Sequence, residues 1–142
     1  MLAALCMVAL SATSPLSSQP SGKVVVLLNA RNPTPALTKT QLRNLFQGTT
    51  SFWHGVVPVK VFVRAPSTAA AKAFLEPFVG QSPQAFAKHW DKLQLAGRGV
   101  APVTMPGPVE LSQAIAKTPG GIGFALASEP WQQNGVKAVP IK

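Results

Sequence analysis

The segment KVVVLLN at positions 23–29, with five apolar residues in succession at 24–28, constrains the fold more than any other feature of the chain. Polar and apolar side chains do not alternate in it, which is typical of a strand buried on both faces. A second run, VVPVKVFV at 56–63, is also mostly apolar and is predicted to be a second buried strand, with Pro58 expected near its first residue. Strands of this kind need helices on both faces of their sheet, and the two runs therefore predict an α/β fold.

Helix signals follow the first run. Thr38 and Gln41 have the spacing of a capping box, and Leu37 can pack on Leu42 as a hydrophobic staple. Gly48 is suited to the left-handed position that ends a helix. We therefore predict a helix between Thr38 and Gly48.

The rest of the chain continues the alternation. Ser67 is expected to cap a helix over 68–78, and Ser82 with Pro83 to begin a second helix that ends before Gly97. The further predicted elements are a loop at 49–55, a strand at 100–105, a helix from 108, a turn at 118–121 and strands at 122–126 and 136–141. The order β-α-β-α-α-β-α-β-β predicts one α/β domain with a mixed, mostly parallel sheet flanked by helices.

The first ten residues are all apolar, a run too short to cross a bilayer as a helix. Small residues follow, so we predict a signal peptide over 1–13, cleaved after Ser11 or Thr13, and a periplasmic protein without a membrane span in its mature chain. A hydrophobic N-terminal helix packed on the domain is the alternative. Residues 14–22 are then expected to be a disordered lead-in, and 23–142 the domain.

Charge and chemistry-bearing residues exclude several functions. Thirteen Lys and Arg stand against four Asp and Glu, a net charge of +9, but the basic residues are scattered, so nucleic acid is not expected as a partner. The single Cys6 excludes an intrachain disulfide and a multi-cysteine zinc site. His54 and His89 each stand alone and are expected to be solvated. With no acid–base pair and no G-x-S-x-G motif, we predict neither an enzyme nor a metal or other cofactor.

Two further groups are expected to serve structure. The glycines at 120, 121 and 123 precede a strand rather than joining a strand to a helix, so they do not form a Rossmann or P-loop motif and are assigned to a tight turn and close strand packing. The large aromatic side chains are expected in the core or at its rim. These are Phe52, Trp53, Trp90 and Trp131.

Ligands of open α/β sheets bind outside the carboxyl ends of the strands, here the loops 29–32, 64–68, 105–108 and 125–128. In the second loop a strand ends at Arg64, and Ser67 and Thr68 begin a helix. Free amides at the helix start, two hydroxyls and a planar guanidinium together predict half of a phosphate or sulfate site. The plainer alternatives are that Ser67 only caps the helix and Arg64 is a solvated charge. No carboxylate or second helix terminus can be placed beside them from the sequence.

Three segments in this order resemble a known family. They are LTKTQLRNLFQGTTSFW at 37–53, VPVKVFVRAPSTAAAKAF at 57–74 and AKTPGGIGFA at 116–125. Together they resemble the phosphate-binding periplasmic proteins of ABC transporters and, more closely, their short relatives. The resemblance runs from about residue 24 to 141.

The resemblance implies a type II periplasmic binding fold, with phosphate held between two lobes by an Arg and a Ser-Gly-Thr segment at a helix start. Arg64, Ser67 and Thr68 fall on that segment. The sequence departs from the pattern in three ways: the glycine between Ser and Thr is absent, Arg64 is one residue closer to the serine, and only one lobe has a counterpart.

Two functions follow from these observations. The first is an exported, non-catalytic protein that binds phosphate or a similar oxyanion at Arg64, Ser67 and Thr68, in phosphate uptake or sensing, with a homodimer supplying the second wall. The second is a lobe that has lost its ligand and docks onto an envelope protein, using exposed aromatics such as Trp53 or Trp131 as anchors.

Overall fold

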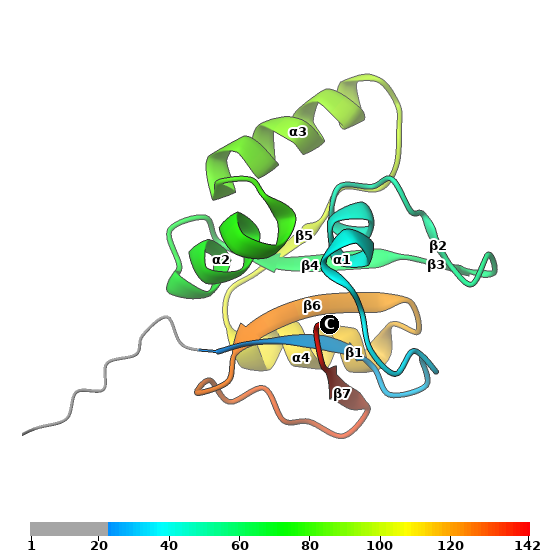
Figure 1. The fold of residues 1–142 in the computed structure, drawn as a ribbon, viewed down its shortest axis with the longest axis vertical. Helices are drawn as coiled ribbons and strands as arrows, with labels where there is room; N and C mark the ends of the chain where they lie inside the picture. The colour runs from blue at the N-terminus through cyan, green and yellow to red at the C-terminus, as the bar shows by residue number, and fades with distance from the viewer. Residues whose placement is uncertain (1–22) are drawn as a thin grey trace, which may run out of the picture.

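The structure, a computed structural model, describes residues 23–142, so the predicted signal peptide at 1–13 and lead-in at 14–22 lie outside the described residues. Figure 1 shows a central sheet with helices on both sides. The elements in chain order are β1 (Val24–Asn29), α1 (Lys39–Phe46), β2 (Phe52–Trp53), β3 (Val57–Pro58), β4 (Lys60–Arg64), α2 (Ala69–Phe74), the π-helical turn η1 (Leu75–Val79), α3 (Pro83–Leu95), β5 (Val103–Met105), α4 (Pro108–Lys117), β6 (Gly121–Leu126) and β7 (Val136–Val139).

The main sheet has five strands in the order β5-β4-β6-β1-β7. β4 runs parallel to both β5 and β6, whereas β1 runs antiparallel to β6 and β7. All its strands except β1 therefore point the same way, which confirms the predicted mixed, mostly parallel sheet. β1 occupies an interior position, as the apolar run at 23–29 predicted.

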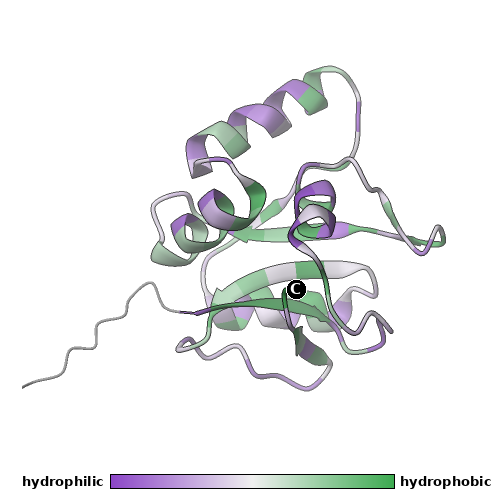
Figure 2. Cartoon of the chain, in the orientation of Figure 1, coloured by the Kyte–Doolittle hydropathy of each residue, from purple (hydrophilic) through white to green (hydrophobic). Residues whose placement is uncertain are grey.

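Side chains of each central strand alternate between two hydrophobic layers. In β1, Val26 and Leu28 face a large cluster built with α1, α2, η1 and α3, while Leu27 faces a smaller cluster with Leu111 and Ile115 of α4. α4 accordingly lies on the opposite side of the sheet from α1 and α2 (Figure 1). In Figure 2, β1 is green along most of its length, whereas α3 alternates between purple and green, as expected for a strand covered on both faces and a helix covered on one.

Three phenylalanines join the helices of the larger layer to the sheet. The ring centroid of Phe74 lies 4.7 Å from that of Phe46 and 4.5 Å from that of Phe124. All three side chains are fully buried. Aromatic pairs at these separations add to the free energy gained from buried area, so this trio is a main anchor of α1 and α2 on β6.

The first predicted helix is confirmed with its cap. The Thr38 hydroxyl accepts from the Gln41 amide, the Gln41 side chain accepts from the Thr38 amide, and Gly48 follows the helix with a φ of +83°. The cap of α3 at Ser82, with Pro83 in the first turn, is confirmed as well.

The helix predicted over 68–78 differs from expectation at both ends. Thr68, not Ser67, caps α2 through a hydroxyl that accepts from the Ala71 amide. After Phe74 the chain widens into the π-helical turn η1, which contains Pro77. Proline has no amide hydrogen and cannot continue the α-helical bonding pattern, which accounts for the change at this point.

The segment at 49–63 is not a loop followed by one strand. Phe52–Trp53 and Val57–Pro58 form a small antiparallel hairpin, β2–β3, and the strand of the main sheet begins only at Lys60. His54 and Gly55, both with positive φ, make the turn that allows this. Two further strands are shorter than predicted. The strand expected at 100–105 is β5, which begins at Val103, and the strand expected at 136–141 is β7, which ends at Val139.

The glycines before and within β6 permit close approach, as predicted. A Cβ on Gly120 would lie 1.8 Å from the Pro58 carbonyl oxygen, and one on Gly123 would lie 2.8 Å from side-chain atoms of both Leu111 and Ile115. A side chain at either position would separate the hairpin or α4 from the sheet. In residues 23–142, no helix is long and apolar enough to cross a membrane.

Candidate functional site

The carboxyl ends of β4, β5 and β6 meet at one edge of the sheet. Arg64 at the end of β4 pairs with Met105 at the end of β5, and β6 ends at Leu126 on the other side of β4. The loop 29–32, which we expected at the carboxyl edge as well, lies at the opposite edge because β1 runs antiparallel to β6. Arg64 therefore shares its edge with the loops 105–108 and 125–128 only.

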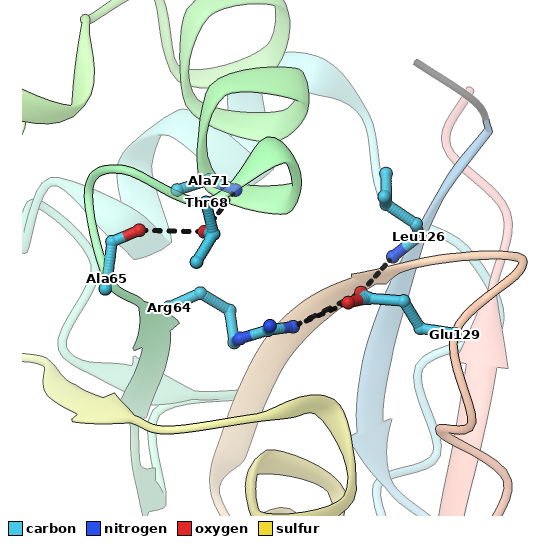
Figure 3. A network of polar contacts seen from close by, with 6 residues as sticks. All are labelled: Arg64, Ala65, Thr68, Ala71, Leu126 and Glu129. Atoms are coloured by element: carbon cyan, nitrogen blue, oxygen red, sulfur yellow. Dashed lines mark hydrogen bonds and ion pairs between the residues drawn. The ribbon is translucent and has the colours of Figure 1, made fainter. Parts of the chain in front are cut away.

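The Arg64 guanidinium is paired with a carboxylate of the same chain (Figure 3). Its Nη1 lies 3.0 Å from Oε2 and 3.2 Å from Oε1 of Glu129. Glu129 Oε1 also accepts from the Leu126 amide at 2.9 Å, so the turn after β6 holds the carboxylate in place. The side chains of Arg64 and Glu129 are 8% and 20% exposed, which makes this a largely buried ion pair.

Thr68 is committed to the start of α2. Its hydroxyl donates to the Ala65 carbonyl at 2.7 Å and accepts from the Ala71 amide at 3.2 Å (Figure 3). The first amides of a helix have no partner within it, and only that of Ala71 is capped here. Ser67 is exposed, and its hydroxyl has no hydrogen bond within residues 23–142.

The three predicted site residues are thus neighbours in sequence that the structure does not bring into one contact. Strand alternation explains why: Val63 faces the layer of α2 and α3, so Arg64 turns toward the layer of α4, where Phe62 also lies. In Figure 3 the Arg64 side chain extends toward Glu129, whereas Thr68 stands over Ala65.

Arg64 keeps unused donor capacity. Its Nε is buried and has no hydrogen-bond partner in the described part of the chain, and Nη1 alone contacts Glu129. A guanidinium has five N–H donors, and the pair with Glu129 uses only those of Nη1. The edge therefore combines a partly satisfied cation, an exposed hydroxyl at Ser67 and uncapped amides of α2.

Glu129 is the residue that sequence reasoning missed. It lies one residue beyond the loop 125–128 that we placed at this edge. Adjacent parallel strands bring the loops after β4 and β6 together, and Glu129 is the first acidic residue after β6. These two facts were enough to suggest an ion pair with Arg64.

The histidines and tryptophans differ partly from expectation. His54 is exposed, as predicted. The prediction that His89 is solvated is wrong, because its Nε2 lies 2.7 Å from the carbonyl oxygen of Gln47 and the side chain is half-buried. Trp53 is 6% exposed and donates to the Gly120 carbonyl, so it cannot serve as an exposed anchor. Trp131 is half-buried. Across residues 23–142, no cluster of three or more His, Cys, Asp or Glu side chains could hold a metal ion.

No protein-family model and no curated protein sequence matches the chain. Solved structures do match. An ABC-type phosphate transport receptor from Vibrio cholerae is 17% identical with a TM-score of 0.56, over 83% of this chain and 45% of that one. A structure from Clostridium perfringens, described as a phosphate ABC transporter substrate-binding protein with bound phosphate, is 17% identical with a TM-score of 0.63, over 83% and 44%. PstS from Borrelia burgdorferi is 12% identical with a TM-score of 0.61, over 84% and 47%.

The chain therefore spans less than half the length of each of these structures. At identities this low, the likeness shows the fold. The fold class predicted from the sequence, an α/β domain like one lobe of a type II periplasmic binding protein, is confirmed. The resemblance stated from the sequence is confirmed at the level of the fold.

Proposed function

We propose that this chain is an exported, non-catalytic solute-binding-like protein that binds phosphate or a similar oxyanion in phosphate uptake or sensing. The ligand lies at the edge formed by Arg64 and the loop before α2. The observation that carries the proposal is the Arg64 guanidinium, buried at the carboxyl edge with its Nε unpartnered within residues 23–142. Its setting is a fold shared with proteins described as binding phosphate.

The binding energy in this proposal comes from charge-assisted hydrogen bonds. An oxyanion contacts Arg64 from the side that Glu129 leaves open. To reach the Ser67 hydroxyl and the first amides of α2 as well, it must lie across the end of β4, because Arg64 turns to the other side of the sheet from α2. Because the Glu129 carboxylate repels an incoming anion and already occupies Nη1, we expect binding to be weak. The protein's net charge of +9 favours the approach of anions in general.

The same ion pair favours a second candidate function, a lobe that binds no ligand and acts as an interaction module in an envelope complex. An internal carboxylate in contact with Arg64 satisfies the cation without any solute. Exposed apolar side chains would then contact the partner, and those of Leu95 and Val100 are 90% and 63% exposed. Trp53 has no part in this version, since it is buried.

Titration with phosphate separates the two. The wild-type protein, Glu129→Gln and the control Glu76→Gln are titrated with inorganic phosphate by calorimetry and by amide chemical shifts, with sodium chloride at matched ionic strength. Both variants remove one negative charge, but Glu76 is exposed on η1 and makes no ion pair within residues 23–142. We expect Glu129→Gln alone to bind phosphate about tenfold more tightly, with shifts at residues 64–70.

Three outcomes contradict oxyanion binding at this edge. The first is no heat and no chemical-shift change at millimolar phosphate in any of the three proteins. The second is an equal gain in phosphate affinity in Glu129→Gln and Glu76→Gln. The third is a set of phosphate-induced shifts that stays unchanged both in Ser67→Ala and in Arg64→Lys. The first of these outcomes leaves the interaction module as the remaining function.

Export and the partner complete the proposal. Cleavage after Ser11 or Thr13 is tested by the mass of the mature protein purified from a periplasmic fraction, and a full-length cytoplasmic product would contradict it. The second wall around the ligand comes from a homodimer or from an envelope protein. Sedimentation with and without phosphate tests the homodimer, because ligand held between two copies makes dimerisation phosphate-dependent.

A further inference from the structure

We propose a second ligand site at the opposite edge of the sheet, where a cavity of about 150 Å³ between the loop after β1 and the β2–β3 hairpin takes a short aliphatic carboxylate. The cavity is lined by Arg31, Asn32, Pro33, Trp53, His54, Val57 and Pro119. None of these residues belongs to the Arg64 edge, because β1 runs antiparallel to β6. The site is therefore independent of the proposed phosphate site.

The loop that forms one wall is held by its own side chains. Asn29 is buried, donates to the carbonyls of Ile115 and Ala116 at 2.9 and 3.2 Å, and accepts from the Arg31 amide at 2.9 Å. Asn32, three residues later, repeats the pattern by accepting from the Thr34 amide at 3.0 Å. Two such turns in succession fix the backbone on which Arg31 and Asn32 stand, so a ligand pays little ordering entropy.

Asn32 presents an unused donor. Its side chain is 5% exposed, and its Oδ1 accepts both the Thr34 amide at 3.0 Å and the Thr34 hydroxyl at 2.7 Å. These two donors fix which atom of the amide is the oxygen, so the other is Nδ2. Within residues 23–142 that Nδ2 makes no hydrogen bond, although it belongs to a nine-tenths buried side chain that lines the cavity. This N–H₂ is not one of the fully buried unpartnered atoms of residues 23–142, so it keeps some exposure and is available to an acceptor in the cavity.

His54 forms the facing wall in a strained conformation. It is the one non-glycine residue with positive φ, +50°, among residues 23–142. Its Nε2 lies 3.2 Å from the Thr34 hydroxyl oxygen, whose single proton is already given to Asn32, so Nε2 must be the donor. The chain His54–Thr34–Asn32 therefore orients both the ring and the amide. Strain of this kind is kept where a side chain must be aimed.

The local charge selects an anion. Arg31 lines the cavity, and Lys137 lies close by, with its Nζ 3.0 Å from the Thr34 carbonyl oxygen. None of the four acidic side chains lines the cavity, and Glu129 is committed to Arg64 at the far edge. Unlike the Arg64 edge, this site has cations without a competing carboxylate.

The walls select a carboxylate with a short apolar body. The cavity wall includes apolar surface from Trp53, Val57, Pro33 and Pro119, while Arg31 and the Asn32 Nδ2 supply a few donors. A doubly charged phosphate needs donors on all sides and finds apolar contacts instead. A cavity of about 150 Å³ is of the size that holds a molecule of about six heavy atoms, as an engineered benzene-binding cavity of this volume illustrates. Butyrate has six.

The test is a titration of the full chain with sodium butyrate as the probe. Sodium chloride is the ionic-strength control. The key variant is Asn32→Asp, since aspartate can still accept both bonds from Thr34 but has no N–H₂ and adds a negative charge. Asn134→Asp, at an exposed position, is the matched control. Arg31→Gln and the exposed Arg98→Gln form a second matched pair.

We expect saturable amide shifts confined to residues 29–34, 53–57 and 119. The butyrate Kd should be weakened about tenfold or more in Asn32→Asp and weakened in Arg31→Gln, with Asn134→Asp and Arg98→Gln like the wild type. Equal shifts with chloride, or unchanged affinity in Asn32→Asp with its spectrum otherwise preserved, would overturn the proposal. Because phosphate binding is read at residues 64–70 and butyrate binding at 29–34, either site can fail without the other.

Discussion

The guanidinium of Arg64 contacts both carboxylate oxygens of Glu129 through a single nitrogen, Nη1, at 3.0 and 3.2 Å. The two residues are 65 positions apart, and their contact ties the end of β4 to the turn after β6. A bidentate fork would use two nitrogens of the guanidinium, so this pair is less than the strongest arrangement an Arg and a carboxylate can form.

We expect the ion pair to couple strongly in a double-mutant cycle. Arg64→Met leaves a largely buried carboxylate, and Glu129→Gln leaves a buried guanidinium, so each single change should lower the free energy of unfolding by about 2–4 kcal/mol. The double variant should be more stable than the sum of the two losses predicts, by about 1–3 kcal/mol. Urea unfolding followed by circular dichroism measures all four proteins. Strict additivity would show that the side chains do not interact.

The start of α2 allows a sharp comparison between adjacent hydroxyls. Thr68→Ala removes the cap on the Ala71 amide and the bond to the Ala65 carbonyl, so it should cost about 1–2 kcal/mol. Ser67→Ala removes an exposed hydroxyl without a partner in the described residues and should change stability by less than about 0.5 kcal/mol. The same unfolding measurement applies. A larger loss in Ser67→Ala than in Thr68→Ala would restore Ser67 as the cap.

The order and type of the main elements could be predicted because each has a local cause. The run at 23–29, the cap at Thr38 and the pair Ser82–Pro83 act through their own neighbours in sequence. The direction of β1 has no such cause, since a strand buried on both faces has the same composition whichever way it runs. The hairpin at 52–58 was missed because its turn residues, His54 and Gly55, differ from the usual pairs for tight hairpins.

The candidate site was predicted only as far as the local sequence extends. Arg64 does end a strand and Thr68 does begin a helix, but strand alternation turns Arg64 to the other side of the sheet from α2. Glu129 reaches it through the adjacency of β4 and β6, which is a property of the sheet order. The cavity beside Asn32 depends in the same way on the direction of β1, and for that reason no motif marks it.

Gly120 is expected to tolerate no side chain. In Gly120→Ala the new Cβ would meet the backbone carbonyl of Pro58, an atom that can move only with the hairpin, at 1.8 Å. We expect a loss of at least about 3 kcal/mol, or failure to fold. Gly107→Ala is the control, because its Cβ would meet the end of the flexible Glu110 side chain, and its loss should stay near 1 kcal/mol or below. Similar losses in both would mean that the hairpin is not packed against Gly120.

The C-terminal end of α1 depends on two adjacent side chains of α3. Trp90 Nε1 donates to the Phe46 carbonyl at 2.9 Å, and His89 Nε2 lies 2.7 Å from the Gln47 carbonyl oxygen, so both satisfy carbonyls that the helix itself cannot. Trp90→Phe should therefore cost about 2–4 kcal/mol, through lost contacts and a buried carbonyl without a donor.

Trp131→Phe provides the comparison, because the Trp131 Nε1 is buried without a partner in residues 23–142 and its removal eliminates an unsatisfied donor. We expect Trp131→Phe to lower the free energy of unfolding by less than Trp90→Phe, by a margin of at least about 1 kcal/mol. Urea unfolding of the two variants measures the difference. Equal losses would mean that the Trp90 bond contributes nothing beyond packing, and that α1 is held on α3 by apolar contacts alone.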